Sequence, residues 1–176
     1  MILEELKGKW KSILEIGCAD GINLLEIKRE YPDRIVKGVD TEMFWDEPDY
    51  TGCVMKAISR GLDVSFGDAR KLPYKDNSFD IVFSKALLVM TKIEDYPLII
   101  KEALRVAKKK VFFIELHSEN KSKTGEYYWQ SGARTRFVAD FKGYLNDLGY
   151  KPIVKSIPKE IWDWKEDWGS IIIVNL

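Results

Sequence analysis

Short, continuous apolar runs alternate with amphipathic stretches along most of the chain, and this alternation restricts its fold more than any other feature. Bounded by turn residues, such runs predict strands at residues 12–16, 35–39, 63–66, 79–83, 111–116, 152–157 and 171–174. The runs at 12–16 and 111–116 are continuous enough to predict buried strands. The amphipathic stretches between most of them predict a doubly wound α/β fold, with a mostly parallel seven-stranded sheet and right-handed crossovers. The last two strands have no helix between them, so we expect an antiparallel hairpin at one edge.

Three stretches predict helices that cover this sheet. Residues 23–30 form the first, which ends before Pro32. Thr91 and Glu94 have the spacing of a capping box and predict the start of a second helix. Three lysines at 108–110 are expected to form a solvated turn before the fifth strand. A third helix is expected up to a cap at Gly149, with an apolar stripe formed by Phe137, Phe141, Tyr144, Leu145 and Leu148.

The length of 176 residues, without repeats or low-complexity tracts, predicts one domain, residues 1–176. Lys plus Arg and Asp plus Glu both total 28, so no overall field attracts nucleic acid, and only a local basic patch could do so. The longest apolar run, residues 86–90, is far too short to cross a bilayer. Because the first residues do not form a signal peptide, we expect a cytoplasmic protein without a membrane partner.

Few side chains are available for metal binding or nucleophilic chemistry. Cys18 and Cys53 stand far apart, and His117 is the single histidine, so no zinc or other metal centre is expected. We interpret Cys18 as a small apolar filler rather than as a nucleophile.

Ligands of a parallel α/β sheet bind beyond the carboxyl ends of its strands. Polar or glycine-containing segments follow four of the expected strands: residues 17–21 (Gly-Cys-Ala-Asp-Gly), 40–41 (Asp-Thr), 67–69 (Gly-Asp-Ala) and 84–85 (Ser-Lys). Each has an ordinary explanation as a turn or a helix cap. The first three, however, occur in register on consecutive strands, and this predicts a ligand site.

The arrangement fits a ligand that carries a nucleoside. Gly17 and Gly21 lack a Cβ, so the backbone can approach a ligand closely, and the next helix offers free N–H groups to a carboxylate or phosphate. Asp40 follows Gly21 by 19 residues and has two oxygens suited to a ribose diol. Asp68 could accept a hydrogen bond from an exocyclic amine such as that of adenine.

The segment at 14–21, Leu-Glu-Ile-Gly-Cys-Ala-Asp-Gly, resembles the E/D-x-G-x-G-x-G motif of class I S-adenosylmethionine-dependent methyltransferases. Val39-Asp40 and the turn at 67–69 are similar to later motifs of that family. The stretch LPYKDNSFDIV at 72–82 is similar to a motif of its small members without a large extra domain, and KEALRV at 101–106 is typical of them. The chain departs from the pattern at Ala19, where the middle glycine is expected, and at the lysines of 108–110.

This resemblance implies S-adenosylmethionine as the cofactor and gives each strand end a role. The glycine loop and Glu15 would line the methionine portion, Asp40 and Thr41 would hold the ribose, and the turn at 67–69 would bind adenine. Ser84 would lie near the methionine amine. The cofactor-binding residues are therefore expected to be Glu15, Gly17, Cys18, Ala19, Gly21, Asp40, Thr41, Gly67, Asp68, Ala69 and Ser84.

Methyl transfer from a sulfonium is an in-line displacement that positioning and desolvation can accelerate without a catalytic side chain. An acceptor with an acidic proton also needs a base. His117, just past the fifth strand, is the candidate for that role, and a hydrogen-bonded structural histidine is the alternative. Ser-Lys-Ala-Leu at 84–87 replaces the N/D-P-P-Y/F motif of members that methylate amino groups of bases and glutamine, which argues against that subclass.

The methyl acceptor could be a small molecule or a side group of RNA or protein. A long polar loop is expected at 118–136, where aromatic residues at 127–129 stand among basic ones. It either stacks on a planar acceptor or forms a lid packed by its own aromatic side chains. The tryptophans at 162, 164 and 168 are either core or edge packing or a surface for a partner or substrate.

Two other functions are compatible with this type of fold. One is a non-catalytic binding or regulatory subunit that needs a partner chain. The other is a nicotinamide-dependent oxidoreductase, which the glycine spacing argues against because the last glycine comes one residue too early for G-x-G-x-x-G.

Overall fold

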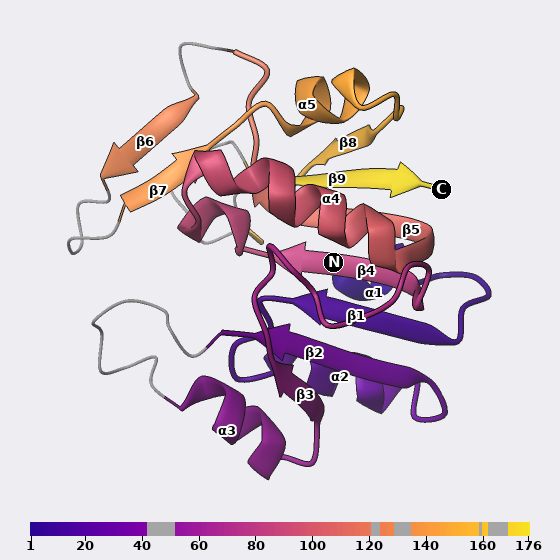
Figure 1. Ribbon diagram of the computed structural model, residues 1–176. Coiled ribbons are helices and arrows are strands. Elements are labelled where there is room, and N and C mark those ends of the chain that lie inside the picture. Colours follow the sequence, from indigo (N-terminus) through magenta and orange to yellow (C-terminus); the bar gives the residue numbers. More distant parts are fainter. Residues whose placement is uncertain (42–51, 121–123, 129–134, 159, 162–168) are drawn as a thin grey trace.

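The computed structural model describes residues 1–41, 52–120, 124–128, 135–158, 160–161 and 169–176. Its centre is a seven-stranded sheet with the strand order β3-β2-β1-β4-β5-β9-β8 (Figure 1). The first five strands are parallel, and β9 is antiparallel to both of its neighbours, which confirms the predicted fold class. The strands of this sheet are β1 Ser12–Ile16, β2 Ile35–Asp40, β3 Asp63–Phe66, β4 Phe79–Lys85, β5 Ala107–Leu116, β8 Ile153–Ser156 and β9 Gly169–Asn175.

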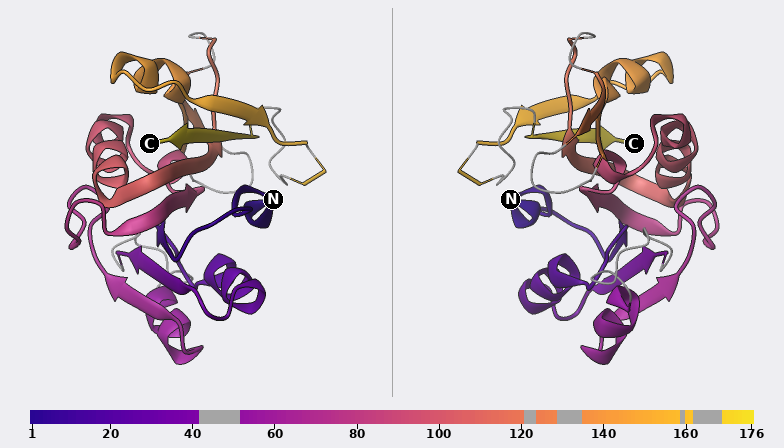
Figure 2. Two further views of the ribbon diagram at one scale, coloured as in Figure 1. Left: turned by 90° about the vertical axis from the view of Figure 1, so that its right-hand side faces the viewer. Right: turned by 90° about the vertical axis from the view of Figure 1, so that its left-hand side faces the viewer.

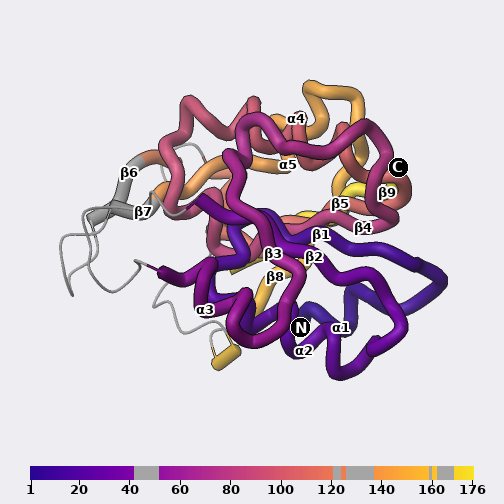
Figure 3. The backbone as a smooth tube through the Cα atoms, turned by 60° about the horizontal axis from the view of Figure 1, so that its bottom comes forward, coloured from indigo at the N-terminus to yellow at the C-terminus, as the bar shows by residue number. Residues whose placement is uncertain are grey.

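Helices cover both faces of the sheet (Figure 2 and Figure 3). One face carries α1 Ile2–Glu5, α2 Ile22–Glu30 and α3 Cys53–Ser59. The other face carries α4 Tyr96–Val106 and α5 Phe141–Asp147. Two short 3-10 turns, Leu88–Met90 and Ile93–Asp95, lie between β4 and α4.

The central strands are buried on both faces, and successive side chains therefore enter two separate apolar cores. Leu14 of β1 packs with Val82 of β4 and Ile100 of α4 in the core beneath α4 and α5. Ile13, the preceding residue, belongs to the core on the other face together with Leu24 of α2. This explains why the strands appear in the sequence as continuous apolar runs rather than as alternating ones.

The carboxyl ends of β1 to β4 meet at one edge of the sheet. Ile16 of β1 pairs with Val39 of β2 and with Ser84 of β4, and Asp40 pairs with Phe66 of β3. The segments that follow these four strands are therefore neighbours. A separate hairpin, formed by β6 Gly125–Tyr128 and β7 Thr135–Val138, extends from the same edge of the sheet (Figure 1).

This hairpin was not expected, because residues 118–136 were predicted to form a loop. Phe137, predicted to lie on a helix, belongs instead to β7, where the Thr-Arg-Phe-Val sequence favours a strand. Helix α5 begins only at Phe141 because Asp140 caps it: the Asp140 carboxylate accepts a hydrogen bond from the N–H of Gly143 at 2.8 Å.

Two further local predictions are wrong. Thr91 and Glu94 do not form a capping box, because Thr91 Oγ1 donates to the carbonyl of Leu87 at 2.8 Å and α4 starts only at Tyr96. The lysines at 108–110 are not a turn but the beginning of β5, where Lys110 pairs with β4 and β9. Lysines are tolerated there because the first two of them are exposed at the end of the sheet.

The last two strands of the sheet form the predicted antiparallel hairpin, but its position differs from the simplest expectation. β9 lies inside the sheet between β5 and β8, so only β8 is an edge strand. Over the ranges that the structure describes, no helix is both long and apolar enough to cross a membrane.

Candidate functional site

The loop between β1 and α2 has a backbone conformation that depends on small residues. Gly17, Ala19 and Gly21 have positive φ angles of 73°, 45° and 77°. A Cβ at Gly17 would lie 2.9 Å from Leu87 Cδ1, and a Cβ at Gly21 would lie 2.5 Å from Leu62 Cδ1. Glycine is therefore needed at both ends of the loop, for the backbone conformation and for close packing.

Asp40, the last residue of β2, is hydrogen-bonded to this glycine loop. Its Oδ2 accepts from the N–H of Ala19 at 2.6 Å, and the carbonyl of Val39 accepts from the N–H of Gly17 at 2.8 Å. Burial raises the pKa of the Asp40 carboxyl, and the N–H groups of Ala19 and Thr41 oppose this rise. The structure thus brings together the predicted ribose-binding acid and the predicted methionine-binding loop.

Glu15 of β1 is fully buried, and its two carboxyl oxygens differ in their surroundings. Oε1 accepts from Asn23 Nδ2 at 2.6 Å, and Asn23 Oδ1 accepts in turn from Lys85 Nζ at 3.4 Å. Oε2 has no hydrogen-bond partner within the described part of the protein. Burial raises the pKa of Glu15 to about 8. A buried oxygen without a partner is energetically costly, so a ligand that donates a hydrogen bond to it would be stabilised.

The turn after β3 packs tightly against β2. The N–H of Gly67 donates to the carbonyl of Asp40 at 2.9 Å, and a Cβ at Gly67 would lie 2.6 Å from Val39 Cγ2. The side chain of Asp68 is half exposed, and it accepts from the N–H of Arg70 at 2.8 Å and from the Arg70 guanidinium. Arg70 lowers the pKa of Asp68, which keeps this carboxylate ionised as an acceptor.

Ser84 and Cys18 are buried, and both side chains contact other parts of the protein. Ser84 Oγ donates to Glu115 Oε1 at 2.9 Å. Cys18 packs against Gly38 of β2, where a Cβ would lie 2.6 Å from Cys18 Sγ. Burial also raises the pKa of the Cys18 thiol, which disfavours a reactive thiolate.

His117 lies just after β5 and is 7% exposed. Its Nδ1 lies 3.2 Å from the main-chain N of Phe141 and 3.2 Å from the carbonyl oxygen of Ala139. In the neutral tautomer that carries its proton on Nε2, Nδ1 can accept from the N–H of Phe141. In the other neutral tautomer Nδ1 donates to the carbonyl of Ala139, and Nε2, which has no partner among the described residues, is the nitrogen that could act as a base. Burial lowers the pKa of His117, which favours a neutral ring. These contacts join the end of β5 to the start of α5, while the role of general base stays a prediction.

Two residues that support the site, one at the glycine loop and one at Glu15, are not among those predicted from the sequence. Arg60 Nη1 donates to the carbonyl of Asp20 at 2.7 Å and to its Oδ2 at 3.1 Å, so the end of α3 is bound to the loop. Asn23 orients Glu15, as described above. A polar residue in the first turn of the helix that follows a buried acid is a signal that could have identified Asn23, whereas no local pattern marks Arg60.

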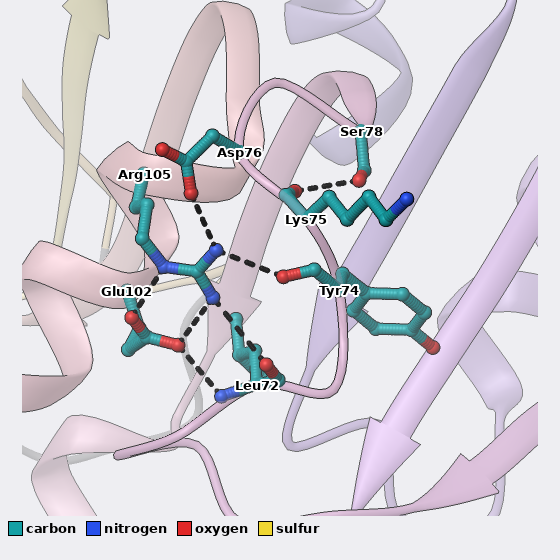
Figure 4. Close-up of polar contacts among 7 residues, drawn as sticks. All are labelled: Leu72, Tyr74, Lys75, Asp76, Ser78, Glu102 and Arg105. Carbon is teal, nitrogen blue, oxygen red and sulfur yellow. Dashed lines mark hydrogen bonds and ion pairs between the residues drawn. The ribbon is translucent and has the colours of Figure 1, made fainter.

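Arg105 of α4 fastens the loop between β3 and β4 to the helix (Figure 4). Its guanidinium donates to the carbonyls of Tyr74 at 2.8 Å and Leu72 at 3.3 Å, and it pairs with the carboxylates of Asp76 and Glu102. Glu102 also accepts from the N–H of Leu72 at 2.7 Å. Because this loop continues directly from the turn that holds Asp68, Arg105 stabilises one side of the site.

These strand ends define a class of protein: a Rossmann-like α/β protein that binds a nucleoside-bearing cofactor. The residues fit S-adenosylmethionine, because the orphaned Glu15 Oε2 suits its ammonium group and the glycine loop allows close approach. No group of three His, Cys, Asp or Glu side chains in the described ranges is placed to hold a metal ion. The expected residues that gather at this edge are Glu15, Gly17, Cys18, Ala19, Gly21, Asp40, Thr41, Gly67, Asp68, Ala69 and Ser84.

Comparison with known families agrees with this class. Residues 13–110, more than half of the 176, match the methyltransferase domain family. The chain therefore belongs to the methyltransferase domain family, and its cofactor is S-adenosylmethionine.

Individual relatives share parts of this chain or its fold. Norajmaline N-methyltransferase from Rauvolfia serpentina is 32% identical over 111 residues, which are 60% of this chain and 35% of that protein. An uncharacterized protein from Haemophilus influenzae is 30% identical over 98 residues, which are 56% of this chain and 39% of that protein. The chain therefore spans well under half the length of these two curated relatives.

Two solved structures show the same fold at low sequence identity. An S-adenosylmethionine-dependent methyltransferase from Methanosarcina mazei has a TM-score of 0.76 and 17% identity, over 99% of this chain and 96% of that one. Magnesium protoporphyrin IX methyltransferase from Synechocystis PCC 6803, with bound S-adenosylmethionine, has a TM-score of 0.64 and 12% identity. The match covers 99% of this chain and 74% of that one.

Proposed function

We propose that this chain transfers a methyl group from S-adenosylmethionine to an acceptor, which is a small molecule or a side group of RNA or protein. One observation carries the proposal: Glu15 Oε2 is a buried carboxyl oxygen without a described partner among the strand ends. A cationic donor forms the strongest hydrogen bonds with such an oxygen, and the methionine end of the cofactor carries an ammonium group.

The residues at the strand ends would divide the binding of the cofactor between them. Glu15 would accept from the ammonium group, with Asn23 and Lys85 holding the carboxyl in place. Asp40 would accept from the ribose hydroxyls, and Asp68, kept ionised by Arg70, would accept from the adenine amine. In each case the cofactor would donate a hydrogen bond to an acceptor that the protein holds in a fixed position. Binding would therefore also orient the cofactor.

The bound cofactor supplies an activated methyl group on a sulfonium and leaves as a thioether. The protein contributes position and exclusion of water, which require rigid walls rather than a reactive side chain. The glycine loop is such a wall, since Asp40 and Arg60 bind it from two sides. An acceptor with an acidic proton would in addition need a base, and His117 is the candidate at this edge.

We place the acceptor on the side of the edge where β4 and β5 end. The hairpin formed by β6 and β7 extends from the sheet there, and hairpins of this kind can cover a substrate (Figure 1). Four tryptophans that are candidates for contact with an acceptor or a partner, Trp129, Trp162, Trp164 and Trp168, lie outside the described residues.

Calorimetry with S-adenosylmethionine, S-adenosylhomocysteine and NADH tests the first step. We expect the first two to bind and NADH not to bind, and the opposite pattern would contradict the proposal. Transfer of a labelled methyl group to a panel of small molecules, RNA and proteins tests the second step. Cofactor binding without labelled product on any acceptor would favour the non-catalytic binding or regulatory subunit.

A further inference from the structure

The carboxylate of Glu115, in β5, supports the turn that follows the neighbouring strand β4. Oε1 accepts from Ser84 Oγ at 2.9 Å and from the N–H of Leu87 at 3.1 Å, and Oε2 accepts from the N–H of Val89 at 3.0 Å. Glu115 is fully buried, and burial raises its pKa to about 7 although these donors oppose the rise. Both oxygens of this carboxylate are therefore used as acceptors by one short segment.

The same turn is held on its other side through its carbonyl groups. The carbonyl of Leu87 accepts from Thr91 Oγ1 at 2.8 Å, and the next carbonyl accepts from Tyr96 Oη at 2.7 Å. The turn begins at Ala86, whose φ of 58° is uncommon for a residue with a Cβ. Side chains from two other elements thus keep the backbone in a conformation that the local sequence does not favour by itself.

Leu87 connects this turn to the glycine loop. A Cβ at Gly17 would lie 2.9, 3.1 and 3.2 Å from three side-chain atoms of Leu87, so this side chain rests directly on Gly17. Interiors as closely packed as this transmit small displacements between neighbouring segments. A shift of the turn away from Glu115 would therefore change the wall of the proposed cofactor site.

We propose that Glu115 is a positioning residue for methyl transfer, because its carboxylate holds the turn at Leu87 and Val89 against Gly17 and so sets the wall of the cofactor site. The inference rests on the proposed function and adds a residue outside the strand-end segments. Glu115 acts through Leu87 and is not expected to contact the cofactor itself.

A carboxylate is needed here because two main-chain N–H groups point at different oxygens. Glutamine has nearly the same shape, but its NH2 group would face one of these N–H donors. If the amide oxygen accepts from Leu87, the amide nitrogen meets the N–H of Val89, and the turn loses one of its two main-chain contacts. Glu115→Gln therefore changes hydrogen bonding with little change in volume.

The test compares Glu115→Gln with Glu5→Gln, which also replaces a buried glutamate, in this case one paired with Lys155 at 2.7 Å and placed on α1. Calorimetry measures the affinity for S-adenosylhomocysteine, and amide hydrogen exchange measures the protection of Leu87 and Val89. We expect Glu115→Gln to weaken binding by about tenfold and to speed exchange by about tenfold at the amide that loses its acceptor. Glu5→Gln should change both quantities by less than about twofold.

Leu87→Ala provides a second, independent variant in case Glu115→Gln does not fold. It removes the side chain that rests on Gly17 but keeps the N–H groups that bond to Glu115. We expect affinity to fall by at least about threefold while the exchange of the Val89 amide stays unchanged.

Unchanged affinity in folded Glu115→Gln, or in Leu87→Ala, would overturn the inference even if the melting temperature fell. Failure of the unaltered protein to bind S-adenosylhomocysteine would instead contradict the proposed function, so the two failures are distinguishable.

Discussion

Asp40 and Ala19 are joined by a hydrogen bond of 2.6 Å, from the main-chain N–H of Ala19 to Oδ2 of Asp40. The acid that ends β2 is therefore part of the support of the glycine loop that follows β1. A ligand that binds Asp40 would also contact the glycine loop, and the hydrogen bond to Asp40 holds that loop in position. Loss of this carboxylate would affect two portions of the cofactor, the ribose and the methionine end.

Asp40→Ala should therefore lower the affinity for S-adenosylmethionine by at least about tenfold, because it removes the proposed ribose acceptor and frees the N–H of Ala19. Isothermal titration calorimetry measures the effect. Asp63→Ala is the matched control, since Asp63 is the first residue of β3, at the opposite end of that strand from the site, and its exposed carboxylate pairs with Lys37. An equal loss of affinity in both variants would contradict the role of Asp40.

The raised pKa of Glu15 leads us to expect that cofactor binding releases a proton near neutral pH. Its folded-state pKa of about 8 lies above the ordinary 4.5, so the folded protein holds this proton more tightly than the unfolded chain. The corresponding stabilisation is complete below pH 4.5 and is lost as the pH rises through about 8. An ammonium group next to Oε2 favours the ionised form, so binding at neutral pH should release up to about one proton and become tighter toward pH 8.

Calorimetry in two buffers with different ionisation enthalpies measures this proton release. Glu15→Gln should abolish the Glu15 share of the release and weaken binding, while its stability should fall less at alkaline pH than that of the unaltered protein. Equal proton release in both proteins would show that Glu15 is not the group that titrates.

Ala19 and Gly21 predict opposite effects of exchanging alanine and glycine within one loop. Ala19 has a φ of 45°, so Ala19→Gly relieves backbone strain, partly offset by the greater freedom of glycine in the unfolded chain, and should stabilise by up to about 1 kcal/mol. Gly21→Ala adds strain and a Cβ placed 2.5 Å from Leu62 Cδ1, and should destabilise by at least about 2 kcal/mol. Urea unfolding measures both, and a stabilising Gly21→Ala would contradict this account of the loop.

Arg105→Ala should destabilise the protein by about 2 kcal/mol, because the carbonyls of Leu72 and Tyr74 lose a donor and Glu102 loses its cation. The side chain of Arg105 is 31% exposed, so water can replace some of the hydrogen bonds that the variant loses. Thermal and urea unfolding measure the change. Lys101→Ala, an exposed position on the same helix, should stay within about 0.5 kcal/mol of the unaltered protein.

The strands and the strand-end segments could be predicted because they depend on local patterns and on topology. A continuous apolar run marks β1 at its observed bounds, the expected bounds of β3 also agree with the structure, and a parallel sheet brings the ends of its strands to one edge. Asp40 and the glycine loop therefore appear together in the structure as the sequence indicates. The hairpin of β8 and β9 could also be predicted from the sequence, although nothing in the sequence shows which of its two strands pairs with β5.

The contacts that complete the site join segments far apart in the chain, and no periodicity reports them. Glu115 is a single acid in an apolar strand, and only the fold shows that three donors converge on it from residues 84–89. Arg60 reaches back to Asp20 over a separation of 40 residues. Helix α3 was missed because its exposed face carries the apolar Met55 and Ile58, which hide the amphipathic pattern, and β6 and β7 were missed because their sequences are polar enough to resemble a loop.

The outermost strands, β3 and β8, are also the shortest of the sheet, with four residues each against ten in β5. Each carries a charged side chain in an ion pair, Asp63 with Lys37 and Lys155 with Glu5. Short, charged borders offer few unsatisfied main-chain groups to a second molecule. The long apolar strands are enclosed between them, so we expect little growth of the sheet by addition of a further strand at either border.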